Sequence, residues 1–316
     1  MMENKEVEKW IGRIGKAKKK WDKYHDLIKT IREYYTNESD RNKQNIFWSS
    51  IETLKPFIYF KAPVPYIDRK DKKQNPVADM AVKILERALE WDLSRQDFDG
   101  VIKYARNDYL LSGLGLTYEQ VNSEIARIQT IDELGNPIEI EAVTKATVDT
   151  LYFDPKDFIC DCQRVKVWED VSWVAQKIEM TKREVIEQFG EDIADELIDP
   201  AHDKEQDLDN DTCVWRIWDK KDKQILYVSE KVKDKFLRAD GDVLGVEGFY
   251  PFPKPVFATL SNNGVIPVPD YTEIKCLLDE LDGVNDRMSL TMKALKVSGC
   301  YDSSMPELAN LLAKDV

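Results

Sequence analysis

The sequence predicts an α+β fold in which long amphipathic helices accompany β-rich segments. Apolar residues recur with helical spacing over residues 5–36 and again over 271–296. Between these helices, the period of the apolar residues shifts towards two over residues 114–177 and again beyond residue 213. The chain is therefore expected to combine a long helix at each end with β-rich blocks between them.

Residues 5–36 are expected to form a single helix. Apolar residues fill heptad positions a and d without interruption over four heptads. We interpret this seam as a face packed on its own subunit, because two tryptophans and two tyrosines make it bulky; a free coiled coil is the alternative. The seam comprises Val7, Trp10, Ile14, Ala17, Trp21, Tyr24, Ile28, Ile31 and Tyr35.

Two shorter helices are expected next. The first ends before Pro56, because proline cannot donate the next helical hydrogen bond, and an extended segment follows it. Asn75 and Pro76 are typical of an N-cap and a first helical position, so a second helix is expected from 77 to about 93. One face of this second helix is apolar and comprises Val77, Ala81, Ile84, Ala88 and Trp91.

A helix capped by Asp97 and stopped at Gly113 is expected to lead into strands. The loop 133–137 contains a Gly-Asn pair that tolerates positive φ, which predicts a hairpin turn. Period-two segments predict strands at 116–121, 124–131, 138–143, 148–153 and 171–177.

A short helix and a second β block follow. Thr181 and Glu184 form a capping box, and the helix that they open is expected to end near Gly190. The acidic, irregular stretch 199–212 is expected to be a boundary or an exposed loop. Prolines between residues 250 and 269 mark sheet edges and extended connectors. The strands expected in this block are 213–218, 224–228 and 232–238.

The last long element is a helix expected over about 271–296. At 1.5 Å per residue it would be roughly 40 Å long. Gly283 costs about 1 kcal/mol relative to alanine but need not end it. A shorter helix is expected near Ser304, where the sequence stops abruptly, and we interpret this ending as a truncation.

Composition excludes some classes of protein. The net charge is −13, and Lys16, Lys18, Lys19 and Lys20 form the one tight basic cluster, which argues against tight binding of DNA but not against its passage. The sequence has no apolar run long enough to span a membrane and no signal peptide at its N-terminus. We therefore expect a protein of the cytoplasm, or of a particle assembled there.

Residues for catalysis or for metal binding are not grouped in a recognisable pattern. The two histidines, His25 and His202, have no partner motif, and no GxxxxGK[ST] phosphate loop is present. Cys160 and Cys162 lack the second pair that a zinc site needs. The acidic run at 207–211 has threonine where a calcium loop needs glycine. We expect no enzyme, no cofactor and no metal; a metal-dependent nuclease is the third-ranked alternative.

The serial order of several phrases resembles the portal, or head-to-tail connector, proteins of short-tailed bacteriophages and prophages. The resemblance covers residues 40–305. Its main phrases are NIFWSSIETLKPFIYFKAPVPY, ARNDYLLSGLGLTYEQ, DPKDFICDCQRVKVWEDVSWVAQKIEMTKREVIEQFG, VWRIWDKKDKQILYV and PFPKPVFATLSNNGVIPVPDYTEIKCLLDELDGVNDRMSLTMKALKVSGCYD.

The resemblance implies a dodecameric ring in the virion that conducts double-stranded DNA non-specifically during packaging and ejection. It implies docking of the large terminase, of tail adaptor proteins and of capsid or scaffolding protein. By analogy, residues 1–198 would form a wing, 199–265 a small α/β clip and 266–316 a stem-type helix, with the crown absent. The alternative function is a helical scaffold or adaptor that binds partners through the N-terminal heptad seam.

The same analogy assigns roles to individual residues. The expected subunit-interface residues of the stem helix are Ile274, Leu278, Leu281, Met288, Met292 and Leu295. The expected channel-lining residues are Asp279, Asp282, Asp286, Lys293 and Lys296. The expected docking residues of the clip are Trp215, Trp218 and Tyr227.

Overall fold

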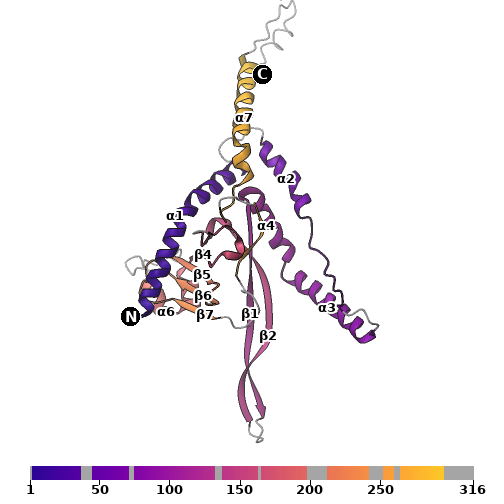
Figure 1. Cartoon of the computed structure of the whole chain (residues 1–316), viewed down its shortest axis with the longest axis vertical. Coiled ribbons are helices and arrows are strands. Elements are labelled where there is room, and N and C mark those ends of the chain that lie inside the picture. Colours follow the sequence, from indigo (N-terminus) through magenta and orange to yellow (C-terminus); the bar gives the residue numbers. More distant parts are fainter. Residues whose placement is uncertain are drawn as a thin grey trace, which may run out of the picture.

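Helices and two antiparallel sheets form a mixed α and β fold, which agrees with the predicted α+β class (Figure 1). The structure is a computed structural model, and it describes residues 2–36, 45–70, 75–131, 137–162, 165–197, 212–241, 252–259 and 264–294. Expectations for the turn at 133–136, the acidic loop, His202, Leu295, Lys296 and the helix near Ser304 lie outside these residues.

The predicted first helix is α1 (Met2–Thr36), and its apolar seam is buried within the same chain except for the half-buried Tyr35. Trp10 contacts Trp173 edge-on, with ring centroids 5.9 Å apart. Trp21 contacts Phe158 edge-on at 5.3 Å. The interpretation of the seam as a face packed on its own subunit is confirmed, because these partners belong to the sheet beneath α1.

That sheet has five strands in the order β3-β4-β5-β6-β7: β3 (Phe158–Cys160), β4 (Trp173–Met180), β5 (Thr212–Asp219), β6 (Gln224–Val228) and β7 (Arg238–Gly241). β4 and β5 pair along all eight residues. The boundary expected at 198/199 therefore falls inside one sheet. The strand expected at 232–238 is wrong, because β7 begins only at Arg238. Val232 and Leu237 are instead buried in an apolar cluster with Val185 and Leu197.

Two short helices, α5 (Lys182–Phe189) and α6 (Glu191–Leu197), follow β4. The capping box is present: Thr181 accepts from the Glu184 amide, and the Glu184 carboxylate accepts from the Thr181 amide. The helix ends at Gly190, which has φ 93°. Together the pair covers a second apolar cluster that includes Val185, Leu197 and Val214.

The second sheet, in the order β2-β1-β8, consists of β1 (Leu114–Ile131), β2 (Pro137–Phe153) and β8 (Lys254–Ala258). The four short strands predicted here merge into two long ones, because the chain continues through a register shift at Glu124/Ile125 instead of ending a strand. β8, which contains Pro255, lies at an edge, as predicted for this segment, and pairs with the first residues of β1.

Three helices cover the flank opposite α1: α2 (Ile46–Ile58), α3 (Pro76–Arg95) and α4 (Phe98–Ser112) (Figure 1). α2 continues past Pro56, and the Arg106 guanidinium satisfies the carbonyls of Lys55 and Tyr59 at its end. Asn75 caps α3 as predicted. Asp97 precedes α4 but makes no capping hydrogen bond from its side chain, so that prediction is wrong.

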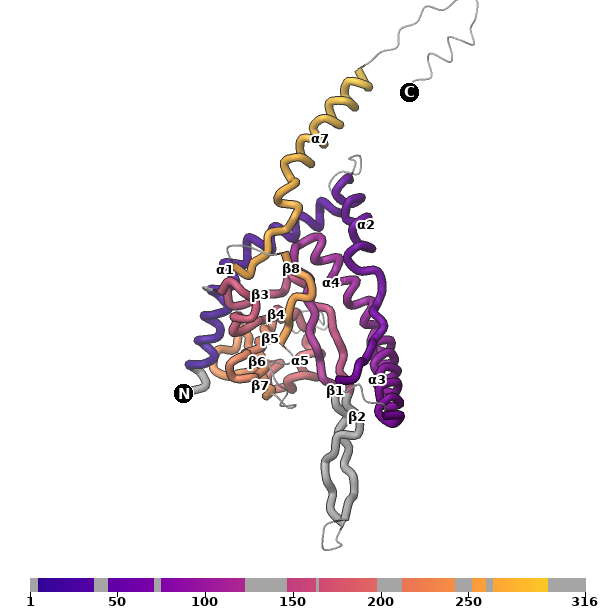
Figure 2. Tube along the Cα trace, turned by 45° about the vertical axis from the view of Figure 1, so that its right-hand side comes forward, coloured from indigo at the N-terminus to yellow at the C-terminus, as the bar shows by residue number. Residues whose placement is uncertain are grey.

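The last described element is α7 (Asp270–Ala294), close to the predicted range. Its first turns pack on α1, α2 and α4 through a cluster that includes Ile31, Phe47, Leu110, Tyr271 and Leu278. Its second half leaves the body of the molecule and extends away from the sheets (Figures 1 and 2).

Candidate functional site

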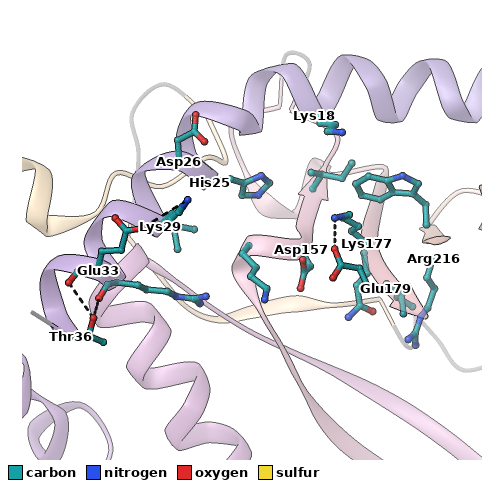
Figure 3. Close-up of a pocket in the computed structure, with 17 residues that line it drawn as sticks. Lys18, His25, Asp26, Lys29, Glu33, Thr36, Asp157, Lys177, Glu179 and Arg216 are labelled. Atoms are coloured by element: carbon teal, nitrogen blue, oxygen red, sulfur yellow. Dashed lines mark hydrogen bonds and ion pairs between the residues drawn. The ribbon is translucent and has the colours of Figure 1, made fainter. Parts of the chain in front are cut away.

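A cavity of about 860 Å³ lies between α1, the short 3₁₀ turn Pro155–Asp157 and strands β4 and β5 (Figure 3). Its charged side chains pair with one another: Lys177 Nζ lies 2.7 Å from Glu179 Oε1, and Lys29 pairs with Glu33 at 4.0 Å. The first pair lies within β4 and the second within α1, so neither of them joins α1 to the sheet.

His25 and Asp157 are two titratable residues that line this cavity. The His25 Nε2 donates to the Phe158 carbonyl at 3.0 Å, and the ring stacks on Trp21. Burial lowers the pKa of His25, so the ring is neutral at pH 7. Burial raises the pKa of Asp157 to about 6. His25 is therefore a packed residue at the boundary between α1 and the sheet.

Arg32 of α1, which also lines the cavity, binds two carboxylates. Its guanidinium lies 3.0 Å from Asp108 Oδ1 of α4 and 2.8 Å from Asp154 Oδ1. Tyr152 of β2 donates a hydrogen bond to the second oxygen of Asp108. This cluster joins α1, α4 and the end of β2, so its evident role is to connect the helical flank to the sheets.

Cys160 is buried and Cys162 is half-buried, and both are free thiols. Within the residues that the structure describes, no group of three His, Cys, Asp or Glu side chains is arranged to hold a metal ion. None of the helices in the described part of the chain is long and apolar enough to cross a membrane.

A large apolar surface is exposed on α7. Its residues are separated by four, three, four and four positions, which places them on one stripe of the helix. We call this the α7 stripe: Leu277, Leu281, Val284, Met288 and Met292, with exposed fractions from 44% to 69%. Solitary apolar residues on a surface are ordinary, but a continuous stripe is typical of an interaction surface.

A second apolar surface follows α2, the extended segment 59–70 and α3. Phe57 and Tyr66 are more than 80% exposed, and α3 has no buried residue at all. The predicted apolar face of α3 is thus present but uncovered by the described chain. We call this the α2–α3 surface: Phe57, Phe60, Val64, Tyr66, Val77, Met80, Ile84, Leu85, Leu89 and Trp91.

The predicted interface residues of α7 divide into two groups. Leu281, Met288 and Met292 lie exposed on the stripe. Ile274 and Leu278 instead pack in the cluster at the base of the helix, so they are not free to contact another subunit. Periodicity placed all of them on one helix, but only the fold distinguishes the base from the projecting half.

The predicted channel residues divide in the same way. Asp279, Asp286 and Lys293 are exposed. Asp282 is buried and accepts a hydrogen bond from the Tyr34 hydroxyl at 3.3 Å, so it cannot line a channel in this arrangement.

The predicted docking residues are mostly internal. Trp215 and Trp218 are buried in the core between α1 and the sheets, which contradicts a docking role. Tyr227 is half-buried and packs edge-on against Phe189 at 5.4 Å. Aromatic residues in a period-two segment do not reveal from sequence alone whether both faces of their sheet are covered.

No protein-family description matches the chain, and no curated protein is significantly similar to it. The two exposed apolar surfaces are therefore the features of the described chain that bear most directly on its function.

Proposed function

We propose that this chain is a subunit of a bacteriophage portal that assembles with copies of itself into a ring, most simply a dodecamer. The supporting observation is the α7 stripe, which lies on a helix that projects beyond the body of the molecule. Burying apolar area stabilises by about 25 cal/mol per Å². Side-by-side packing of α7 helices from neighbouring subunits would gain this free energy.

The α2–α3 surface supports the same proposal. A cyclic ring uses head-to-tail contacts, in which each subunit contributes two different patches. The α7 stripe and the α2–α3 surface are two such patches on different elements of one chain. Because α3 has no buried residue, packing against its own chain contributes little to its stability. We therefore assign α3 to a contact with a neighbouring subunit.

The negative net charge of the chain favours a channel through which DNA passes over a protein that binds DNA tightly. Each chain carries −13, and Asp279 and Asp286 are exposed on α7. A channel lined by acidic side chains repels the DNA backbone and shortens the residence of each phosphate. In this proposal the chain supplies the passage and the docking platform, while the terminase supplies ATP hydrolysis.

Negative-stain electron microscopy and native mass spectrometry of the full chain test the proposal. We expect annular particles with a central hole, in equilibrium with monomers at low concentration. The double variant Leu281→Glu/Met288→Glu should remain monomeric, because two buried charges at a subunit contact are costly.

The matched control adds the same two charges to α7 away from the stripe, as Thr272→Glu/Ser289→Glu; both positions are exposed. This control should assemble like the unmodified chain. Monomers that persist at high protein concentration, or equal assembly by both variants, would contradict the proposal.

The alternative, an adaptor that binds partners through the heptad seam, is less favoured by the geometry. Val7, Ile14, Trp21 and Ile28 of the seam are each at most 1% exposed. A partner would have to displace the sheet from α1 before it could reach them.

A further inference from the structure

The buried residues of α7 all lie in its first half. They are Tyr271, Leu278 and Asp282. The ring of Tyr271 packs on Tyr34, with centroids 5.4 Å apart, and the Tyr34 hydroxyl donates to the Asp282 carboxylate at 3.3 Å. Tertiary contacts therefore hold residues 270–282 in place, and we call this segment the base of α7.

Beyond the base, α7 has no residue that is buried by the described chain. Every residue from 286 to 294 is exposed, and Leu290 and Met292 have exposed fractions of 66% and 69%. This outer segment extends away from the body of the molecule (Figure 2). Helices shorter than about 12 residues are marginal in water unless packing stabilises them. The outer segment therefore depends on the base, or on another molecule, to remain helical.

The turn at which burial ends is also the turn of α7 with the lowest helix propensity. All four of its residues rank below leucine, methionine, lysine and arginine, and glycine ranks lowest of the four. A Cβ added to Gly283 would meet no atom within 4 Å, so packing does not require glycine there. We call this turn the α7 joint: Gly283, Val284, Asn285 and Asp286.

The α7 stripe crosses this joint. Leu277 and Leu281 lie on the base, whereas Met288 and Met292 lie beyond the joint. Their spacing of three and four positions places them on one face only while the turn between them is helical. A surface that covers the whole stripe gains contacts on both sides of the joint and thereby stabilises its helical form.

We propose that the α7 joint is a conformational switch, which opens in the isolated subunit and is held closed when the stripe is covered. Opening breaks the hydrogen bonds from the amides of residues 287–290 to the carbonyls of the joint, so the outer segment changes direction relative to the base. The closing step rests on the proposed function, because the stripe is there covered by a neighbouring subunit. The opening step does not depend on it.

Association of subunits then includes an ordering step. The cost of closing the joint is subtracted from the free energy of the contact. A neighbour that covers only the base side of the stripe does not close the joint, whereas one that covers both sides does. The joint therefore favours complete contacts between subunits over partial ones.

Hydrogen–deuterium exchange with mass spectrometry tests the opening step on the full chain, diluted until it is monomeric. We expect the amides of residues 287–290 to exchange at least about a hundredfold faster than those of 275–282, whose opening also breaks tertiary contacts. Gly283→Ala should slow the exchange of 287–290 by up to about fivefold, because alanine has the higher helix propensity. Equal protection of the two segments, or unchanged exchange in this variant, would overturn the switch.

The matched control is Gly15→Ala, the same substitution in α1 at a position where an added Cβ also meets no atom within 4 Å. It should leave the exchange of 287–290 unchanged, and slowing equal to that in Gly283→Ala would contradict a local joint.

The same measurement on assembled particles tests the closing step. There the amides of 287–290 should become as protected as those of the base. Rapid exchange of these amides in assembled particles would overturn the closing step alone. Failure of the chain to assemble at any concentration would overturn the proposed function and the closing step together, while the opening step is decided by the monomer.

Discussion

At the scale of single residues, two glycines have opposite environments. Gly15 lies inside α1, is exposed, and a Cβ added to it would meet no atom within 4 Å. Gly115 is the second residue of β1 and lies against α4, and a Cβ added to it would collide with the backbone carbonyl of Ala105. Replacement of the two residues by alanine therefore has opposite expected effects on stability.

We expect Gly15→Ala to raise the free energy of unfolding by about 0.5–1 kcal/mol, since alanine has the higher helix propensity. We expect Gly115→Ala to lower it by about 1–3 kcal/mol, because the backbone of α4 must move. Urea denaturation of both variants measures these changes. Destabilisation by Gly15→Ala would contradict the open environment described here.

At the scale of elements, the contrast is between α1 and α3. Both show a clear apolar face in the sequence, yet the face of α1 is buried against the five-stranded sheet and that of α3 has no cover in the described chain. The stability of the subunit should therefore depend on α1, while α3 should matter for association.

Trp21→Ala tests the role of α1. The side chain is fully buried and contacts the rings of Tyr24 and Phe158 edge-on at 5.3 Å. We expect the free energy of unfolding to fall by about 3–5 kcal/mol, as for other large side chains removed from a core. Lys19→Ala on the exposed side of α1 is the control and should change it by less than about 0.5 kcal/mol.

At the scale of the whole molecule, the Arg32 cluster connects the helical flank to the sheets and makes stability depend on pH. Burial raises the pKa of Asp108 to about 6 from its ordinary value of 3.8. The folded chain therefore binds this proton more tightly than the unfolded chain does. Stability should fall as the pH rises from about 4 to about 6 and change little above that range.

Urea denaturation at several pH values measures this dependence. For Asp108 the expected fall is at most about 3 kcal/mol. Asp157, whose pKa burial also raises to about 6, contributes in the same direction. Asp108→Asn should remove part of the slope with pH, whatever its effect on stability at a single pH. If this variant retains the full slope, Asp108 is not the titrating group.

The sequence by itself determined the elements whose signals are local. The heptad pattern predicted α1, the Asn75–Pro76 pair predicted the start of α3, and Thr181 with Glu184 predicted the start of α5. It also predicted the α7 stripe as a helical face. Each of these signals depends on residues within one or two helical turns, so no distant contact is needed to read it.

Only the tertiary structure decided which apolar faces are buried. Trp215 and Trp218, which the sequence suggested as docking residues, are buried in a cluster formed with distant residues of α1, β1 and β2. Trp218 contacts the rings of Tyr118 and Phe153, with centroids 5.7 and 6.0 Å away. The base of α7 buries Leu278 and Asp282, while Met288 stays exposed on the same helix. The physical reason is that periodicity reports that a face is apolar, whereas its burial depends on which distant segment packs against it.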